Sequence, residues 1–385
     1  MRYILMNKNT PILTCEIDAA SGAISKILEN HNLEYLPVGI GTNKIFLRHN
    51  LNEWWKGRSI PASRQGLDIA LTEMGIANKD ELLTKSFGLS LSDQYWINPN
   101  GLLEWSKINF FDNSFSEDVG DILFGNPSGN KELDLSSPDN TSDGWLRKRW
   151  KIVSSNRCLI KGGSEPYLQE GINEAFATII LNRLGAYDYV HYDLIFDKEC
   201  NPYSICQNFI TSDTELVTAW QIMQIEKKDN KISEYTHLLN CSANLGIEGA
   251  QDFLDYLIAF DYLILNTDRH FGNFGAIRDV NTLKFIGFAP IYDNGTSLWH
   301  NKLEINIRPT QDFWESRPFY KSPIRQLGLV TSFKKFDLSK LHGIEQNFYG
   351  LLSRSSTITN ERRDILCQGI IRRIDKFQEI IKERT

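Results

Sequence analysis

The sequence predicts an α+β protein with two lobes and an additional α+β subdomain at its N-terminus. Three patterns support this expectation. Residues 145–209 follow the order strand, strand, helix, strand, strand. From Glu215 onward, the apolar spacing typical of helices dominates. Residues 125–144, GNPSGNKELDLSSPDNTSDG, contain hardly any large apolar side chain and indicate a loop before the first strand. We therefore expect a small antiparallel β lobe with one helix, followed by a mainly helical lobe.

The composition is that of a globular protein. Of the 385 residues, 41 % are apolar and 23 % are charged, and this length predicts two or three domains. A net charge of −6 argues against direct binding to nucleic acid, and no stretch approaches the roughly 18 apolar residues of a membrane span. The six scattered cysteines form no CxxC pair, and the start lacks the layout of a signal peptide. We therefore expect a cytoplasmic protein with reduced thiols and no membrane segment.

The first unit, residues 1–125, mixes strands and helices. Its expected elements are a hairpin of strands at 2–6 and 12–17, helices at 63–75 and 79–86, and an aromatic, turn-rich stretch at 95–124. We expect this subdomain to dock a target or a partner, because aromatic side chains are enriched at contact surfaces.

The second and third units follow the loop. The second unit, 126–210, begins with a loop at 126–144 that we expect to be flexible, and its elements are strands at 145–153 and 158–161, a helix at 170–184, and strands at 189–196 and 203–209. The third unit, 211–385, has a buried helix at 252–265, two short strands at 274–278 and 283–288, and closing helices at 338–352 and 360–382.

Three polar residues after the buried helix indicate phosphoryl-transfer chemistry. Asp268 and Asn273 have the spacing D-x-x-x-x-N, and Asp293 follows the next two strands. Phosphoryl transfer needs a carboxylate that accepts the proton of a hydroxyl, and oxygen ligands for the Mg²⁺ that neutralises the phosphates. Asn in place of another Asp keeps such a site from becoming too negative for a nucleotide. Asp, Asn and Gly are also ordinary turn residues, but here three oxygen ligands fall at the ends of predicted strands.

A lysine upstream completes a phosphate-binding set. Lys161 ends a predicted strand, from which its ammonium can reach the phosphates of ATP when a carboxylate on the next helix holds it. Glu170 and Glu174 lie one turn apart on the same face of that helix, so the spacing does not choose between them. Gly144 is the glycine at the position of a phosphate-covering loop.

Two further segments are candidates for nucleotide contacts. Gln207, Asn208 and Phe209 lie in the stretch SICQNFI, where the connection between the lobes can pair its backbone with adenine. His270, two residues after Asp268, belongs to the same candidate site. We expect it to hold the turn through a hydrogen bond to the backbone, with metal ligation as the alternative. Arg269 is expected to balance Asp268 or a phosphate, or only to face solvent.

The strings NTDRHFGN and APIYDNG together resemble the HipA family of bacterial Ser/Thr kinases. The resemblance covers about residues 144–330, and the LIK strand, the NEAFATIILNRLG helix and the YSICQNFI strand occur in the order of that family. It implies a two-lobed protein-kinase-like fold. It also implies that Asp268 is the catalytic base, that Asn273 and Asp293 bind Mg²⁺, and that Lys161 pairs with Glu174.

The resemblance has further implications for regulation and partners. Members of the family are often toxins of toxin–antitoxin pairs, phosphorylate a protein target, and in some cases autophosphorylate a serine of the phosphate-covering loop. Ser136, Ser137 and Ser142 are the corresponding candidates here. The sequence contains no helix-turn-helix pattern, so we expect a DNA-binding antitoxin to be a separate chain.

The sequence therefore predicts an ATP- and Mg²⁺-dependent Ser/Thr protein kinase. Two alternatives remain open at this stage. One is a small-molecule or lipid kinase, because DRHxxN is also similar to the loop of phosphatidylinositol kinases. The other is a catalytically inactive regulator that binds a nucleotide.

Overall fold

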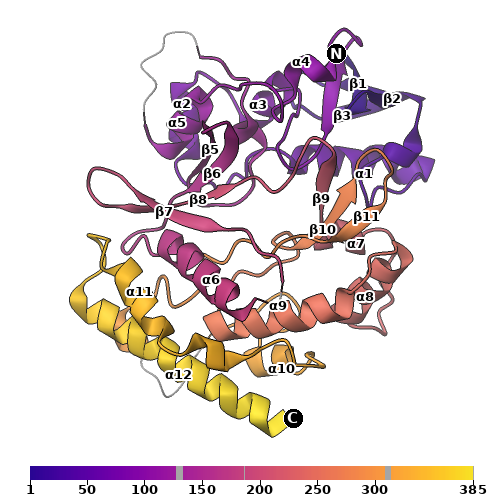
Figure 1. The fold of residues 1–385 in the computed structure, drawn as a ribbon. Helices are drawn as coiled ribbons and strands as arrows, with labels where there is room; N and C mark the ends of the chain where they lie inside the picture. Colours follow the sequence, from indigo (N-terminus) through magenta and orange to yellow (C-terminus); the bar gives the residue numbers. More distant parts are fainter. Residues whose placement is uncertain (127–132, 186, 308–313, 385) are drawn as a thin grey trace.

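The N-terminal subdomain is built around a four-stranded antiparallel sheet (Figure 1). The computed structural model describes residues 1–126, 133–185, 187–307 and 314–384. The sheet has the order β3–β2–β1–β4, with β1 (Arg2–Asn7), β2 (Thr10–Ile17), β3 (Ile24–Asn30) and β4 (Tyr95–Pro99). The helices of the subdomain are α1 (Lys44–Gly57), α2 (Leu67–Glu73), α3 (Lys79–Lys85), α4 (Trp105–Ile108) and α5 (Asp118–Phe124). Leu47, Leu51 and Trp55 of α1 pack into the core of this sheet. The expected hairpin is present, whereas α1, β3 and the elements β4, α4 and α5 within the turn-rich stretch 95–124 were not predicted.

The second sheet forms the β lobe. Its order is β5–β6–β8–β7, with β5 (Lys148–Val153), β6 (Asn156–Lys161), β7 (Tyr192–Phe196) and β8 (Pro202–Gln207), all antiparallel. Helix α6 (Glu170–Leu184) lies against β7 and β8, with the bounds that the apolar spacing predicts. The predicted loop 126–144 is described only in part, because 127–132 lie outside the described residues.

The helical lobe also contains a small sheet. Its helices are α7 (Ala219–Met223), α8 (Glu234–Asn244), α9 (Ala250–Ile264), α10 (Pro323–Leu327), α11 (Ile344–Leu352) and α12 (Asn360–Arg384). The sheet has the order β11–β10–β9, with β9 (Thr214–Thr218), β10 (Gly275–Asp279) and β11 (Phe285–Phe288). The predicted single helix at 338–352 is wrong: a 3₁₀ turn at Leu338–Leu341 precedes α11, and Gly343 separates them with a φ of +72°.

Strand β9 falls where the sequence predicts mainly helix, and its inward side chains explain the difference. Val217 and Glu215 both face inward along the strand. The Glu215 carboxylate accepts a hydrogen bond of 2.5 Å from Arg278 Nε. A charged residue at a buried position interrupts the apolar alternation by which a half-buried strand is recognised.

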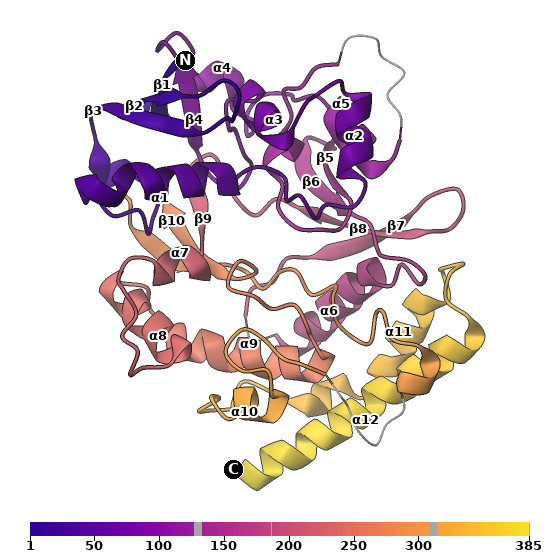
Figure 2. The same ribbon diagram turned by 180° about the vertical axis from the view of Figure 1, so that it is seen from behind.

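The largest hydrophobic core joins α6 to the helical lobe. Phe176 of α6 and Phe348 of α11 are fully buried, and their rings stack with centroids 4.1 Å apart and planes 10° apart. Helix α6 therefore contacts the β lobe on one side and the helical core on the other (Figures 1 and 2). This position lets α6 carry a side chain into the space between the lobes. Within the described residues, no helix combines the length and the apolar character needed to cross a membrane.

Replacing Phe348 tests this core. We expect Phe348→Ala to lower the free energy of unfolding by about 3–5 kcal/mol, because it leaves a cavity against Phe176. Urea unfolding followed by tryptophan fluorescence measures the change. Tyr349→Ala on the same helix is the control, since Tyr349 is 44 % exposed, and we expect it to cost less than about 1 kcal/mol. Equal losses for the two variants would contradict this description of the core.

Candidate active site

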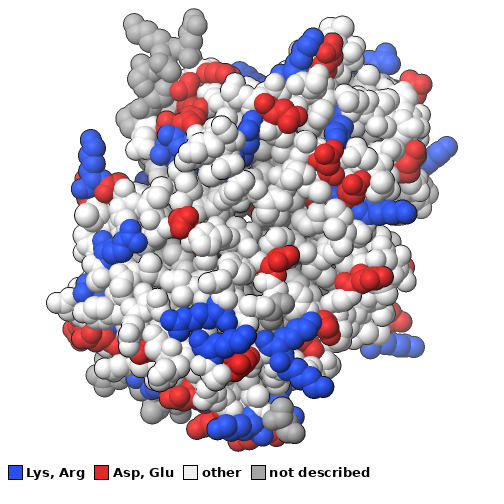
Figure 3. All heavy atoms as spheres, in the orientation of Figure 1, with Lys and Arg blue, Asp and Glu red and all other residues white. Residues whose placement is uncertain are grey.

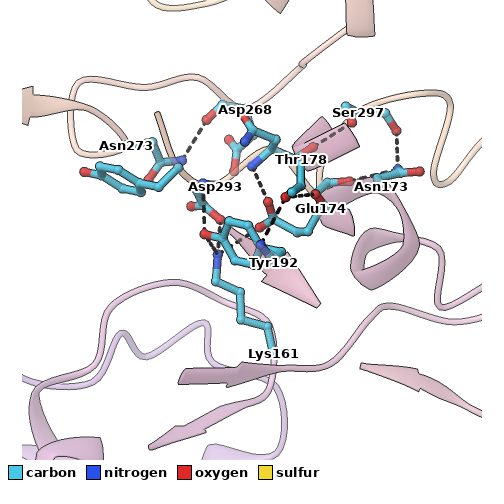
Figure 4. A network of polar contacts seen from close by, with 12 residues as sticks. Lys161, Asn173, Glu174, Thr178, Tyr192, Asp268, Asn273, Asp293 and Ser297 are labelled. Carbon is cyan, nitrogen blue, oxygen red and sulfur yellow. Dashed lines mark hydrogen bonds and ion pairs between the residues drawn. The ribbon is translucent and has the colours of Figure 1, made fainter. Parts of the chain in front are cut away.

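The centre of the candidate site is the ammonium group of Lys161, at the end of β6 (Figure 4). It donates to Glu174 Oε1 on α6 at 3.0 Å and to Asp293 Oδ1 at 2.6 Å. The Tyr192 hydroxyl on β7 lies 3.4 Å from the same nitrogen. Lys161 is 7 % exposed. One buried cation thus holds together the β lobe, α6 and the segment that follows β11.

The charges in this cluster stabilise one another. Burial by itself would lower the pKa of Lys161, but Asp293 and Glu174 raise it well above its usual range. Burial would raise the pKa of Asp293, but Lys161 and Lys148 hold it below its usual range. At neutral pH the site therefore presents a permanent cation beside a permanent anion.

The structure pairs Lys161 with Glu174 and not with Glu170. The second carboxylate oxygen of Glu174 accepts the N–H of Asn294 at 2.9 Å, which also ties α6 to the segment of Asp293. Glu170 turns toward Ser164, whose backbone N–H lies 3.0 Å from Glu170 Oε2 and whose hydroxyl also donates to the carboxylate.

Asp268 and Asn273 lie in the loop that follows α9. Asn273 Nδ2 donates to the backbone oxygen of Asp268 at 3.0 Å, so the loop closes on itself (Figure 4). Asn266 Oδ1 accepts the N–H of Asp268 at 3.0 Å. His270 Nδ1 accepts the N–H of Gly272 at 3.1 Å, which is the turn-holding contact that we expected of this residue. The loop is thus fixed by its own polar side chains.

Arg269 is the residue that joins this loop to its surroundings. It is fully buried, so it does not face solvent, and the anion that it balances is Asp261 rather than the expected Asp268 or a phosphate. Its Nε donates to Asp261 Oδ2 on α9 at 2.9 Å. Its Nη1 donates to the backbone oxygens of Asn273 at 2.9 Å and Tyr292 at 2.6 Å, and its Nη2 to Asn294 Oδ1 at 2.6 Å. One guanidinium therefore sets the distance between the loop of Asp268 and the segment of Asp293.

The Asp268 carboxylate is half-buried at the open side of the site. Burial raises its pKa, and the nearby charge of Asp293 adds to this effect. Arg317 Nη1 lies 3.4 Å from Asp268 Oδ1. Arg317 is exposed and belongs to a segment that the sequence analysis did not connect to the site.

Asn273 and Asp293 fit a metal ion only in part. Among the described residues, no group of three or more His, Cys, Asp and Glu side chains is arranged to hold a metal. Asn273 and Asp293 offer one amide oxygen and one carboxylate, which is typical of Mg²⁺ sites that complete their coordination with phosphate oxygens and water. The residues therefore fit a metal that arrives with a phosphorylated substrate.

The candidate nucleotide-binding residues after β8 are only partly directed at the site. The Phe209 ring lies 5.5 Å from the Tyr292 ring, beside Asp293. The backbone N–H of Asn208 already donates to Arg157 at 2.7 Å, and its side chain reaches Leu91 in the N-terminal subdomain. Gln207 is exposed and donates to Asn156. Of the three, only Phe209 contacts a residue next to Asp293.

The three candidate serines differ in accessibility. Ser136 is exposed. Ser137 is fully buried and donates to Asp139, and Ser142 is buried and donates to the backbone oxygen of Asp139 at 2.9 Å. Only Ser136 is open to a phosphoryl donor in this conformation.

The comparisons with known proteins give the class of the fold. No protein-family model matches the sequence, and no curated protein is similar enough in sequence to count as a relative. HipA of Shewanella oneidensis MR-1, in a structure with HipB and operator DNA, superposes with a TM-score of 0.60 and 13 % identity over 98 % of this chain and 97 % of its own. The proinflammatory kinase CtkA of Helicobacter pylori covers 62 % of this chain and 91 % of its own, with a TM-score of 0.48 and 17 % identity. The chain therefore has a two-lobed, protein-kinase-like α+β fold. In particular, it has the fold of the HipA-like kinases, as the sequence resemblance implies.

Several residues of the site were not found by sequence reasoning. Tyr192, Asn294 and Asp261 contact Lys161, Glu174 and Arg269, but each lies in a different segment. Lys148 could have been found from the sequence, because pairing the two predicted strands as a hairpin places it directly opposite Lys161. Lysines at facing positions of two paired strands indicate a shared anion, and Asp293 is the anion on which both act here.

Removing Arg269 tests its role in fixing the loops. We expect Arg269→Met to lower the free energy of unfolding by about 3–5 kcal/mol, because it leaves the Asp261 carboxylate buried without its cation. Urea unfolding at pH 7 measures the loss. The double variant Arg269→Met, Asp261→Asn should lose less than the single one, and a single variant as stable as the wild type would contradict the role.

The buried Asp139 predicts a pH dependence of stability. Burial raises the pKa of Asp139 to about 7, and the hydrogen bonds from Trp150 N–H (2.9 Å) and the Ser137 hydroxyl (3.1 Å) offset this only in part. The unfolded value is about 3.9. The folded state then binds a proton that the unfolded state lacks, so stability falls as pH rises from about 4 to about 7 and levels off above. The urea concentration at the unfolding midpoint should decline less between about pH 4 and about pH 7 for Asp139→Asn than for the wild type. An equal decline for the two proteins would refute the role of Asp139 in this pH dependence.

Proposed function

We propose that this chain is an ATP- and Mg²⁺-dependent Ser/Thr protein kinase. The observation that carries the proposal is the ion cluster of Lys161, Glu174 and Asp293 next to the loop of Asp268 and Asn273. Each of these groups supplies a part that phosphoryl transfer requires. The HipA-like fold supports the proposal, and the order of the five residues along the chain is the one that the resemblance to that family implies.

The geometry suggests the following division of roles. Asp268 accepts the proton of a serine or threonine hydroxyl, whose oxygen forms a bond to the γ-phosphorus. The bond between that phosphorus and the β–γ bridging oxygen breaks, and ADP leaves with the electron pair. Lys161 binds the phosphate oxygens while Glu174 orients it. Asn273 and Asp293 would hold Mg²⁺, which supplies neutralisation of the phosphate charge.

The raised pKa of Asp268 suits this role. A carboxylate that is less acidic than usual accepts a proton more readily, provided that it is still ionised before the reaction. Arg317 stabilises the ionised form in the absence of a substrate. An incoming hydroxyl has to share Asp268 with this guanidinium or displace it.

We further propose that the kinase acts as the toxin of a two-chain toxin–antitoxin module. The Shewanella HipA is described in a complex with HipB and operator DNA. In this chain the net charge is −6. On the face shown in Figure 3, basic and acidic side chains occur together in both lobes, with a group of Lys and Arg over the helical lobe. We therefore assign DNA contact to a separate antitoxin. Ser136 is the serine that we propose for autophosphorylation.

Label transfer from ATP tests the catalytic proposal. We expect Mg²⁺-dependent labelling of protein by the wild type and a rate about 10²–10⁴-fold lower for Asp268→Asn, because that variant lacks the proton acceptor. The affinity of Asp268→Asn for ATP should change little. Asp293→Asn should instead weaken ATP binding in Mg²⁺ more than in EDTA. Scintillation counting of the labelled protein measures the rate of transfer, and isothermal titration calorimetry measures the affinity for ATP.

The matched control is Asp252→Asn, at the exposed far end of α9, which should label like the wild type. Mass spectrometry of the product identifies the acceptor residue. Equal labelling by the wild type and both site variants would refute this mechanism. Label found in lipid or in a small molecule instead of protein would point to a kinase with a different acceptor.

A further inference from the structure

A single arginine of the N-terminal subdomain holds the loop that leads into β5. Arg64 is 3 % exposed. Its Nε donates to the backbone oxygen of Gly144 at 2.6 Å, and its Nη2 donates to the backbone oxygens of Ser142 at 2.6 Å and Asp143 at 3.1 Å. Both terminal nitrogens also lie 3.3 Å from the Ser142 hydroxyl. The neighbouring backbone N–H of Gln65 donates to Trp145 at 2.9 Å.

This stretch lies at the phosphate end of the candidate site. A Cβ added to Gly144 would come within 2.4 Å of Lys148 Nζ, so the lysine head lies against this glycine. Lys148 faces Lys161 directly in the β5–β6 pairing, and Asp293 and Asp143 are among the charges that act on it. The stretch 142–144 therefore covers the end of the sheet from which Lys161 reaches Asp293.

The contacts of Arg64 also determine where the loop directs its amides. In a trans peptide the N–H points opposite to the C=O of the same unit. Because the three carbonyls of 142–144 converge on Arg64, the N–H groups of Asp143, Gly144 and Trp145 point away from the subdomain. The Gly144 N–H is satisfied at 2.6 Å by the Asp143 carboxylate. The Asp143 carboxylate thus places an anionic oxygen on a backbone amide beside Lys148, as a phosphate oxygen would be placed.

We propose that Arg64 is a positioning residue for the phosphate-covering loop, so that the N-terminal subdomain sets the affinity of the site for the phosphates of ATP. The inference rests on the proposed function and adds a role for residues 1–125. Arg64 does not reach the nucleotide. It acts by keeping the carbonyls of 142–144 turned toward the subdomain and the N–H groups of 143–145 turned away from it. Without it, the loop regains its conformational freedom and loses the ordered amides.

The same subdomain offers a matched control. Arg58 is also largely buried, with bonds of 2.7 and 3.0 Å to the Asp93 carboxylate and of 2.7 Å to the backbone oxygen of Gly88. None of these partners belongs to the loop 142–144. Arg58→Met thus removes a comparable buried arginine without releasing the loop.

The test compares ATP with adenosine, which lacks the phosphates that the loop covers. Full-length wild type, Arg64→Met, Arg64→Lys and Arg58→Met are titrated with Mg²⁺–ATP and with adenosine by calorimetry, and melting temperatures are recorded. We expect Arg64→Met to weaken ATP binding about 10–100-fold, as expected for loss of one or two charge-assisted hydrogen bonds, and to leave adenosine binding unchanged. The affinity of Arg64→Lys for ATP should lie between those of the wild type and Arg64→Met, since an ammonium cannot reach all three carbonyls. The KM for ATP should rise more than kcat falls.

A purely structural arginine would give a different pattern. It would lower the melting temperature and leave the ratio of ATP to adenosine affinity at the wild-type value, as we expect for Arg58→Met. That result for Arg64→Met would overturn the inference while the proposed function stands. A wild type that binds neither ligand would overturn the proposed function and this inference with it. Where Arg64→Met does not fold, the ratio of ATP to adenosine affinity is measured for Arg64→Lys. A ratio below the wild-type value supports the inference, and an unchanged ratio overturns it.

Discussion

The buried ammonium of Lys161 is the interaction on which the arrangement of the site depends. Burying a charge is costly unless partners satisfy it, and the partners of Lys161 come from α6 and from the segment after β11. No single lobe can supply both. The fold is therefore stable in this form only when the β lobe, α6 and the Asp293 segment are together, which is also the arrangement that the proposed phosphate binding requires. Stability and the geometry of the site depend on the same contact.

Arg269 plays the corresponding part on the helical side. The loop of Asp268 contains few apolar side chains, so packing alone cannot fix its shape. Arg269 replaces packing with directed hydrogen bonds to Asp261, Asn273 and Tyr292, all within the interior. A buried guanidinium whose donors are all used defines angles as well as distances. This explains how a loop of turn-forming residues can hold a carboxylate and an amide in a fixed relation.

The sequence predicts the parts of the site that depend on local spacing. The interval from Asp268 to Asn273, the lysine at the end of β6 and the bounds of α6 are all properties of short segments. The choice between Glu170 and Glu174 is different, because residues four apart share a helix face and the decision depends on where Ser164 and Asn294 lie. The buried state of Arg269 depends on Asp261, eight residues earlier on α9. Strand β9 was not predicted because its inward side chain Glu215 is charged, and Arg278, the residue that pairs with it, lies on another strand.

The contacts of the N-terminal subdomain explain why it cannot be a freely moving appendage. Arg64 binds the loop before β5, and Asn208 of the connection between the lobes donates to Leu91 of the subdomain at 3.0 Å. On the helical side, Arg278 donates to the Tyr95 hydroxyl at 2.9 Å. The subdomain is thus attached to the phosphate loop, to the connection and to the small sheet of the helical lobe. Any opening of the lobes therefore has to break at least one of these contacts, two of which are buried.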